Sequence, residues 1–463
     1  MSDKAYSSKN AWLNMEDVEH EEIFAFNQEY AQFMNENKTE RKFVRSSIEL
    51  LEAEGFRNIT EFTSLKKGDR VYKVNRDKAL IAVVIGEKPL VDGVHIVGAH
   101  MDSPRIDLKP NPLFEDSELA YFDTHYYGGI KKYQWVSIPL AIHGVVIKQD
   151  GSKVEINIGD KEDDPVFYIS DLLPHLGKDQ MQKKMSEGIS GEQLNLLVGS
   201  IPLADKDKDG KDKVKNAILD YLSDEYGITG EDLISSELQI VPAFKAKDVG
   251  FDRGLLAAYG HDDRVCSYTA LKAILEVDNP VNTAMALLVD KEEVGSMGST
   301  GMQSRFFENT MAEMIDLAND KFSELMLRKA IENSKALSAD VNAAFDPNYP
   351  DVYNKSNSAF LGKGVVVTKY TGARGKSGSS EACAEFVAEI RSLFNNQGVI
   401  WQIGELGKVD KGGGGTIAQF LANYNMDVLD CGPAVISMHA PYELVSKVDV
   451  YNTYLAYQVF LEK

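Results

Sequence analysis

Cysteine, long apolar runs and positive charge are all scarce in this 463-residue chain. The three cysteines, Cys266, Cys383 and Cys431, lack the spacing of a metal site or a disulfide framework, so a reducing compartment, the cytoplasm, is expected. No run of about 18 apolar residues occurs, so we expect no membrane span. Residues 1–10 are polar and show no signal peptide. The formal charge of −21 argues against nucleic acid as a partner, because phosphate binding needs clustered lysine and arginine.

What is present is enough chain for two globular domains, each with a sizeable core. Ala79–Ile85 is almost continuously apolar, as expected of a central strand covered on both faces. Helical patterns occur before and after such strands along the chain. The expected helices are Glu21–Asn37, Ser46–Glu54, Arg264–Glu276, Glu313–Ser338 and Ser379–Asn395.

The composition changes between about residue 109 and residue 246, which predicts an inserted domain. A strand is expected at Val136–Ile147, and helices at Asp179–Glu187 and Val214–Tyr226. Asp205–Gly210 opens like a calcium-binding loop, but the twelfth position is Asn216 instead of glutamate, so we interpret it as a surface turn.

The most informative stretch is an apolar strand, Met285–Val289, that runs into Asp290, Lys291, Glu292 and Glu293. Ligands of open α/β sheets bind just beyond the carboxyl ends of strands. Of two adjacent acids beside a metal, one can be a ligand and the other a general base. The alternative is a solvated turn.

Four other polar clusters are also candidates for metal ligands or their partners. His100 and Asp102 follow a strand and project from the same side, so Asp102 could orient the imidazole. Asp262 lies at the start of a helix, where a cap is the alternative reading. Asp340 follows a short approach segment, and His439 ends a short apolar strand.

Together these clusters form a mixed nitrogen and oxygen ligand set that suits zinc, with cobalt or manganese possible. Five ligands are too many for one tetrahedral ion and suffice for two ions if one carboxylate bridges them. Asp262, Glu292, Glu293 and Asp340 carry four negative charges, which two divalent cations balance. The predicted ligands are His100, Asp262, Glu293, Asp340 and His439.

At this point the sequence resembles the M18 family of metallo-aminopeptidases, the group of aspartyl aminopeptidase and vacuolar aminopeptidase I. The motifs occur in family order across nearly the whole chain. They are Gly98–Pro104, Gly260–Arg264, Asp290–Ser296, Ser338–Asp340 with Pro347–Tyr349, and Ser437–Ala440.

The resemblance implies a zinc-exopeptidase α/β/α sandwich, formed by residues 1–108 plus 247–463. Residues 109–246 would form a β-rich dimerisation domain, and six dimers a tetrahedral dodecamer. His100, Asp262 and Asp340 would hold one zinc ion. Asp262, Glu293 and His439 would hold the other, with a cis peptide bond after Asp262.

The implied reaction removes the N-terminal residue from peptides, with Glu292 as the general base for metal-activated water. Asp102 would orient His100, and His143 would reach the active site of a neighbouring subunit and stabilise the oxyanion there. A related zinc amidohydrolase acting on acylated amino acids, and a non-catalytic shell with the same fold, remain alternatives.

Substrate preference stays open. The glycine-rich run 412–415 could cradle substrate backbone or form a tight turn, and it lacks the lysine of a P-loop. The segment keeps Asp410 but has glycine where eukaryotic aspartyl aminopeptidases carry Pro-Cys, which makes an acidic preference doubtful. Lys369, Arg374 and Lys376 could bind an acidic side chain or be ordinary surface charge. The predicted substrate-binding residues are Asp410, Gly413 and Gly414.

Overall fold

The computed structural model describes residues 6–14, 17–204, 211–319 and 321–463. Asp205–Gly210, the turn resembling a calcium loop, lies outside these residues. The contacts divide the chain into two compact units. The first unit is Met1–Asp102, Ala246–Met438 and Glu443–Lys463, and the second unit is Ser103–Lys245 with His439–Tyr442. We describe each unit by itself, beside the expected domains of residues 1–108 plus 247–463 and 109–246.

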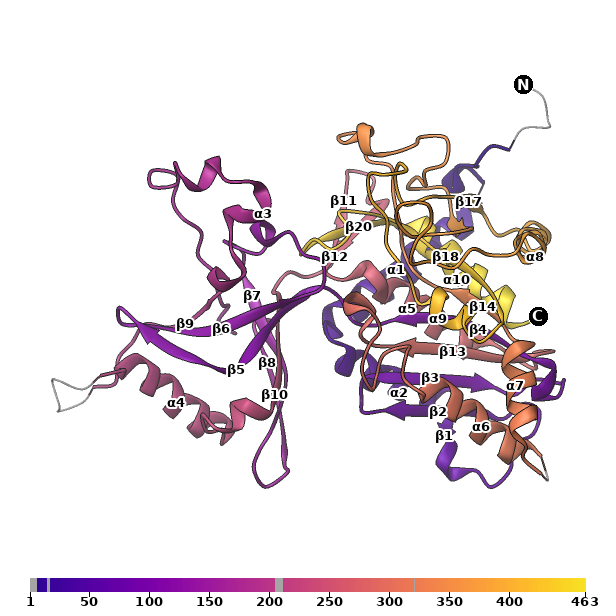
Figure 1. The fold of residues 1–463 in the computed structure, drawn as a ribbon, viewed down its shortest axis with the longest axis horizontal. Coiled ribbons are helices and arrows are strands. Elements are labelled where there is room, and N and C mark those ends of the chain that lie inside the picture. The colour runs from indigo at the N-terminus through magenta and orange to yellow at the C-terminus, as the bar shows by residue number, and fades with distance from the viewer. Residues whose placement is uncertain (1–5, 15–16, 205–210, 320) are drawn as a thin grey trace. The chain divides into compact units, whose positions relative to one another are not determined.

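A nine-stranded sheet runs through the described part of the first unit, in the order β1-β2-β3-β13-β4-β14-β18-β16-β17 (Figure 1). The four strands β13, β4, β14 and β18 are parallel to one another, so their carboxyl ends meet at one edge. The strands are β1 (Arg57–Asn58), β2 (Arg70–Asn75), β3 (Ala79–Val84), β4 (Val94–His100), β13 (Thr283–Val289), β14 (Lys335–Ser338), β16 (Val365–Thr368), β17 (Trp401–Ile403) and β18 (Asp427–Gly432).

Helices cover both faces of this sheet, because alternate residues of its strands point to opposite sides. Leu80 and Ala82 of β3 belong to one apolar cluster, whereas Ile81 and Val83 belong to another. The first cluster includes α1 (Asp17–Glu36), α2 (Glu40–Ala53), α5 (His261–Glu276), α8 (Ala384–Asn396) and α10 (Lys447–Leu461). The second cluster includes α6 (Phe306–Ala318), α7 (Glu324–Glu332) and α9 (Ala418–Ala422).

The C-terminal helix α10 is buried along most of its length against the sheet. The phenol of Tyr457 donates to the carbonyl of Cys431 at 2.6 Å. The ring of His95, at the start of β4, stacks on Phe460 with centroids 5.0 Å apart. His95 is therefore a structural residue. The helix therefore covers one face of the sheet at β4.

A smaller five-stranded sheet, in the order β11-β12-β20-β19-β15, completes the first unit. Its strand β12 leads directly into α5, and β20 lies beside β12, so this sheet fixes the start of α5. The strands are β11 (Lys247–Val249), β12 (Leu255–Ala258), β15 (Asn342–Ala343), β19 (Ala434–Ile436) and β20 (Glu443–Ser446).

The described part of the second unit is β-rich, as the family resemblance implied. A six-stranded antiparallel sheet in the order β8-β7-β10-β5-β6-β9 packs with α4 (Lys213–Tyr226). The strands are β5 (Arg105–Asp116), β6 (Leu119–Tyr127), β7 (Leu140–Ile147), β8 (Lys153–Ile158), β9 (Leu196–Gly199) and β10 (Ser236–Pro242).

Two expected helices are wrong in part. The stretch predicted as a helix at Asp179–Glu187 forms only a 3₁₀ turn and the four-residue α3 (Met185–Gly188), because the segment has few apolar residues to bury. The end of Glu313–Ser338 is the strand β14, which lies between β4 and β18. Its sequence, Lys-Ala-Leu-Ser, has no β-branched residue, and pairing on both sides overrides its weak local preference.

Together the two units confirm the expected mixed α/β fold. None of the helices in the described part of the chain combines the length and apolar character that crossing a bilayer requires.

Candidate active site

The residues predicted from strand ends converge at the carboxyl edge of the large sheet. β4 ends at His100, which pairs with Val289 of β13. Asp340 follows two residues after β14, and Asp262 lies in the first turn of α5. Among the described residues, three overlapping groups bring potential ligand atoms within 4.8 Å of one another. They are His100–Glu292–Asp340, His100–Asp262–Glu293 and Asp262–Asp263–Asp340.

His100 is buried at the centre of this cluster. Its Nε2 lies 3.4 Å from Oδ1 of Asp262, 3.8 Å from Oε2 of Glu292 and 4.0 Å from Oδ2 of Asp340. Burial by itself lowers the pKa of His100, but the carboxylates of Asp102 and Asp262 outweigh it and raise the pKa well above its usual value. Nε2 thus faces several negative charges and is placed to bind a cation.

Asp102 holds three parts of the cluster with one fully buried carboxylate. Its Oδ1 lies 3.3 Å from Nδ1 of His100 and also accepts the backbone N–H of Glu292 at 3.1 Å. Its Oδ2 accepts the backbone N–H of Glu293 at 3.2 Å. The backbone carbonyl of Asp102 lies 3.0 Å from Nδ1 of the same histidine. The residue therefore orients both the imidazole and the turn that carries the two glutamates.

Asp262 is fixed through its backbone. The peptide bond between Asp262 and Asp263 is cis, as the family resemblance implied. The N–H of Asp262 donates to Oε2 of the buried Glu443 at 2.9 Å. Oδ2 of Asp263 accepts the N–H of His100 at 3.3 Å, which ties the start of α5 to the end of β4.

Two of these residues were missed by sequence reasoning. Asp263 joins Asp262 and Asp340 in one of the three groups, and its place in the same Gly-His-Asp-Asp-Arg motif could have indicated it. Glu443 gave no local signal, because its partner lies 181 residues away in the chain. The neighbouring His261 is a structural residue, because its ring lies 2.7 Å from the phenol of Tyr30 and 3.2 Å from the carbonyl of Leu256.

The carboxylates of the cluster lie so close to one another that their repulsion disfavours full ionisation without a positive charge. Burial, and after it the charge of Asp263, raises the pKa of Asp340 well above its ordinary value. Burial likewise raises the pKa of Asp263, although the charge of His100 opposes this. Buried imidazole and carboxylate groups around one space are the donors that zinc binds. The residues present therefore fit a zinc centre.

Two predicted residues, His439 and His143, are not members of any of the three groups found among the described residues. His439 belongs to the second unit, where its Nδ1 lies 3.1 Å from the carbonyl oxygen of Gly129. His143 is fully buried on β7 of the same unit, with Nε2 2.8 Å from Oδ2 of Asp160. Both remain predictions from the resemblance.

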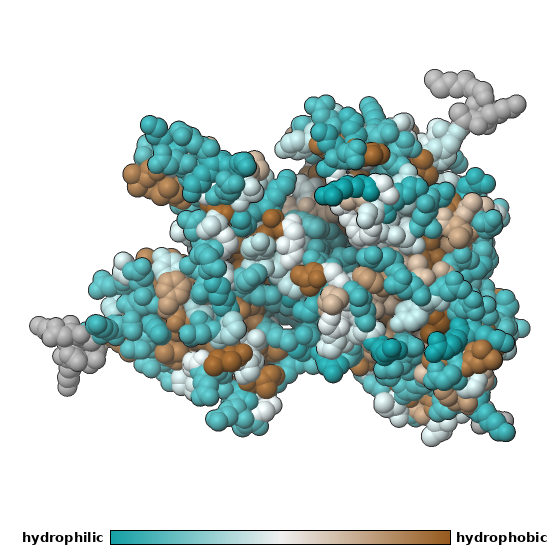
Figure 2. Space-filling view, viewed as in Figure 1, coloured by the Kyte–Doolittle hydropathy of each residue, from teal (hydrophilic) through white to brown (hydrophobic). Residues whose placement is uncertain are grey.

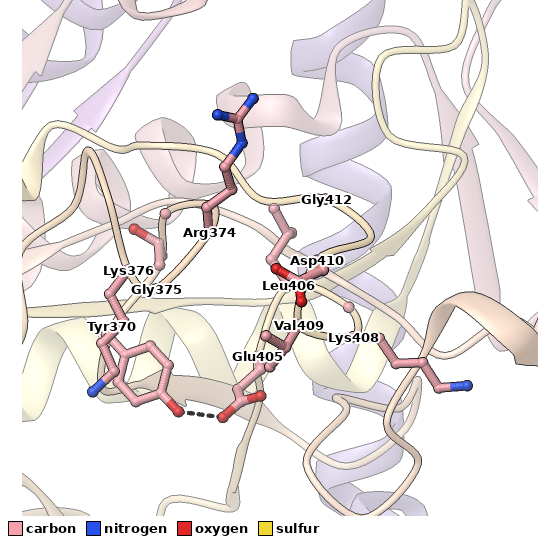
Figure 3. A pocket seen from close by; sticks show the side chains of 13 residues that line it. Tyr370, Arg374, Gly375, Lys376, Glu405, Leu406, Lys408, Val409, Asp410 and Gly412 are labelled. Atoms are coloured by element: carbon pink, nitrogen blue, oxygen red, sulfur yellow. Dashed lines mark hydrogen bonds between the residues drawn. The ribbon is translucent and has the colours of Figure 1, made fainter.

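A pocket of about 170 Å³ lies between the loops that follow β16 and β17 (Figure 3). Asp410 lines it, and the charged ends of Arg374 and Lys408 point outward in this view. Gly413 permits close packing of the two loops, because a Cβ there would lie 2.0 Å from the carbonyl oxygen of Gly372. The carbonyl of Gly414 accepts the N–H of Gly372 at 2.6 Å.

The glycine-rich loop leads from this pocket to the strand that precedes Asp340. Thr416 donates its hydroxyl to Oδ1 of Asp430 at 2.6 Å, and the hydroxyl of Ser338 lies 3.5 Å from that of Thr416. Ser338 ends β14, two residues before Asp340. The loop thus connects the pocket to the acidic cluster within the first unit.

The lysines considered for an acidic side chain already face a carboxylate. Nζ of Lys376 lies 2.8 Å from Oε1 of Glu381, and Nζ of Lys369 lies 3.6 Å from the same atom. The lysine charges lower the pKa of Glu381, with Lys376 as the larger cause. One carboxylate therefore balances one of the two positive charges.

The comparisons with known proteins are consistent with a zinc centre at this cluster. The model of the aminopeptidase I zinc metalloprotease family (M18) matches residues 33–461. The chain belongs to the M18 family. A probable M18 family aminopeptidase 1 from Clostridium acetobutylicum is 54% identical over 457 residues, which cover 98% of each chain.

Solved M18 structures share the fold. The crystal structure of an M18 aminopeptidase from Thermotoga maritima is similar with a TM-score of 0.95 and 48% identity, and it covers 99% of this chain and 100% of that one. The structure of the S. cerevisiae mApe1 dodecamer is similar with a TM-score of 0.74. At 22% identity over 94% of this chain and 95% of that chain, that likeness concerns the fold. The chain is therefore an M18 zinc aminopeptidase, a hydrolase that removes N-terminal residues.

Proposed function

We propose that this M18 aminopeptidase uses two zinc ions, one held by His100, Asp262 and Asp340 and the other by Asp262, Glu293 and His439. The overlap of the three ligand groups at His100, Asp262 and Asp340 is the observation that carries the proposal. Cobalt or manganese would suit the same donors. Bound zinc supplies Lewis-acid polarisation of the scissile carbonyl and a lower pKa for water.

Glu292 is the general base in this proposal. Its Oε2 lies 3.8 Å from Nε2 of His100, so its carboxylate faces the space that the ligands surround. Its backbone is held by Asp102, which limits the positions the side chain can take. Glu292 accepts a proton from the attacking water and returns it to the leaving amine.

The pocket of Figure 3 receives the side chain of the N-terminal residue. Asp410 contributes a carboxylate to its lining, while Gly413 and Gly414 keep the two loops together. Glu381 balances part of the lysine charge nearby.

We propose that the second unit mediates dimerisation and that dimers build a tetrahedral dodecamer. The dodecamer of the structurally similar mApe1 supports this. So does exposed apolar surface on the second unit around α3, visible in Figure 2. Leu176, Met181 and Met185 are 69–71% exposed there. Burying such side chains between copies is favourable.

His143 would complete a neighbouring active site only in this assembly. In the single chain it is buried against Asp160, so a contact with a neighbour requires that ion pair to open. The reducing cytoplasm is the proposed compartment, and the free state of Cys266, Cys383 and Cys431 supports it.

The deciding experiment is the substitution Glu292→Gln with bound metal and turnover measured on the same preparation. We expect a fall in kcat of about 10²- to 10⁴-fold, the usual contribution of a general base, with metal content unchanged. Glu49→Gln, on the exposed face of α2, is the matched control. A panel of aminoacyl and N-acyl substrates separates the aminopeptidase from an amidohydrolase. Full activity of Glu292→Gln would refute the general-base role.

A further inference from the structure

The segment between β13 and α6 closes on itself, with Glu292 and Glu293 inside the loop. Where the loop closes, the N–H of Asp290 donates to the carbonyl of Thr300 at 3.2 Å, and the hydroxyl of Thr300 donates to Oδ2 of Asp290 at 2.6 Å. Both residues are buried. We call residues 291–299 the glutamate loop, and the pair Asp290 and Thr300 its neck.

The buried carboxylate of Asp290 depends on Thr300. Its Oδ1 has no hydrogen-bond partner among the described residues, and the ammonium group of Lys291 lies 3.9 Å from Oδ2. A buried acceptor that loses its hydrogen bond is unfavourable. The hydroxyl of Thr300 therefore favours the closed neck.

The segment that follows the neck packs directly on the glutamate loop. Nε2 of Gln303 donates to the carbonyl of Gly295 at 2.8 Å, and the N–H of Gln303 donates to the carbonyl of Ser296 at 3.2 Å. Gly301 permits this close approach, because a Cβ there would lie 2.4 Å from the carbonyl oxygen of Ser296. Gln303 thus holds two successive carbonyls of the loop.

The backbone of the glutamate loop is one that its own residues do not favour. Lys291, directly before Glu292, has a φ of +72°, which is uncommon for a residue with a side chain. Such conformations persist where the surrounding structure imposes them. Asp102 accepts the N–H groups of Glu292 and Glu293, and the neck restrains the two ends of the loop.

We propose that Thr300, acting through Asp290, is a positioning residue for the general base Glu292. While the neck is closed, the loop backbone keeps the carboxylate of Glu292 in one place. When the neck opens, that carboxylate takes several positions and meets the attacking water less often. The inference rests on the proposed function, because it takes Glu292 as the base. All the contacts that carry it lie within the first unit.

The test is Thr300→Val, which removes the hydroxyl and nearly keeps the shape of the side chain. We expect kcat at saturating zinc to fall by about 10-fold or more, because a misplacement of about 1 Å can cost about 100-fold in rate. KM should stay within about 2-fold, as expected when only a transition-state interaction is lost. Thr300→Ser keeps the hydroxyl and should restore most of kcat.

The matched control is Thr310→Val. Thr310 is buried in the same unit, and its hydroxyl donates to the carbonyl of Phe306 inside α6, away from the glutamate loop. This substitution also removes a buried hydroxyl, so it reports the general effect of that loss. It should leave kcat and KM as in the wild type.

Hydrogen exchange of residues 290–300 gives a readout that does not depend on activity. It is measured on the zinc-bound protein and again after zinc has been removed by a chelator. Exchange should be faster in Thr300→Val than in the wild type in both forms, because an open neck lets the N–H groups of Glu292 and Glu293 leave Asp102 more often. Thr310→Val should not change the exchange of this segment.

A double-mutant cycle with Glu292→Gln separates positioning of the base from other effects. In the Glu292→Gln background, Thr300→Val should lower the residual kcat by less than about 2-fold. Gln303→Met removes the donor to Gly295 at an exposed position and should lower kcat by about 5-fold, the value of one net hydrogen bond. This second variant decides the matter if Thr300→Val folds poorly.

The outcomes distinguish the two levels of the proposal. If Glu292→Gln loses activity but Thr300→Val and Gln303→Met keep the kcat and the exchange of the wild type, the positioning role is wrong and the general-base role stands. If Thr300→Val lowers kcat equally with and without Glu292, or if Thr300→Ser is as slow as Thr300→Val, the inference fails. If Glu292→Gln is fully active, the general-base role fails and the positioning role fails with it.

Discussion

Replacing Asp102 by asparagine should weaken metal binding more than any other single change outside the ligands themselves. Its carboxylate accepts the N–H groups of Glu292 and Glu293 and lies 3.3 Å from Nδ1 of His100. Asparagine keeps one of the two oxygens and places an NH₂ group at the other position. That group would face a backbone N–H or the imidazole N–H, and two donors cannot bond each other.

The size of the effect follows from these contacts. A hydrogen bond to a charged group contributes about 1.5–3 kcal/mol, and at least one of them is lost in Asp102→Asn. Because each 1.4 kcal/mol is tenfold, metal affinity should fall by about 10- to 100-fold, in line with other residues that orient ligands. kcat should also fall at saturating zinc, because the turn that carries Glu292 loses a hydrogen bond to residue 102.

The assay is competition for zinc against a chelator of known affinity, followed by kcat at saturating zinc. Circular dichroism confirms that the variant is folded. Asp92→Asn, at an exposed position before β4, is the control for loss of a carboxylate. Unchanged zinc affinity in Asp102→Asn would show that the ligands hold their positions without this carboxylate, and the account of the cluster given above would be wrong.

Three further predictions concern charge, pH and metal. Glu381→Gln should free the ammonium groups of Lys369 and Lys376 and raise kcat/KM for acidic relative to leucine substrates by up to about 5-fold, since solvent screens exposed charges and keeps the effect small. An unchanged ratio would show that the pocket does not sense these charges. Burial lowers the pKa of His95 to about 4, so the metal-free protein should lose stability as the pH falls from about 6.5 to about 4. In the His95→Leu variant, the loss of unfolding free energy between pH 7 and pH 4, measured by urea denaturation, should be about 3 kcal/mol smaller than in the wild type. An identical pH dependence in the two proteins would contradict the low pKa of His95. Zinc at one hundred times its dissociation constant should stabilise the chelator-treated protein by about 2.7 kcal/mol in calorimetry, and no change would mean that the cluster is not a metal centre.

Secondary structure was predicted most accurately from the sequence where neighbouring residues in the chain determine it. The apolar runs of β3, β4 and β13 and the helix α5 were recognisable because burial on both faces requires continuous apolar character. The convergence of His100, Glu293 and Asp340 with Asp262 was predictable because strand ends of a parallel sheet meet at one edge, beside which α5 begins. The strand β14 was mistaken for helix, since its pairing depends on neighbours far away in the chain.

The part that could not be predicted consists of contacts that only the folded chain creates. Nothing near Glu443 indicates that it accepts the N–H of Asp262, and nothing near Gly129 indicates that its carbonyl meets His439. The partial neutralisation of Lys369 and Lys376 by Glu381 likewise depends on how a loop folds back. Such contacts decide the orientation of a group, whereas the sequence pattern reveals only its presence.

The packing of α10 on the large sheet has a consequence for biosynthesis. The strand Val94–His100 leaves the ribosome long before the helix Lys447–Leu461 that covers it. The first unit therefore cannot complete its core until α10 has been made, whereas Ser103–Lys245 is continuous and can form its own sheet beforehand. A chain that lacks α10 should consequently have an incomplete core in the first unit.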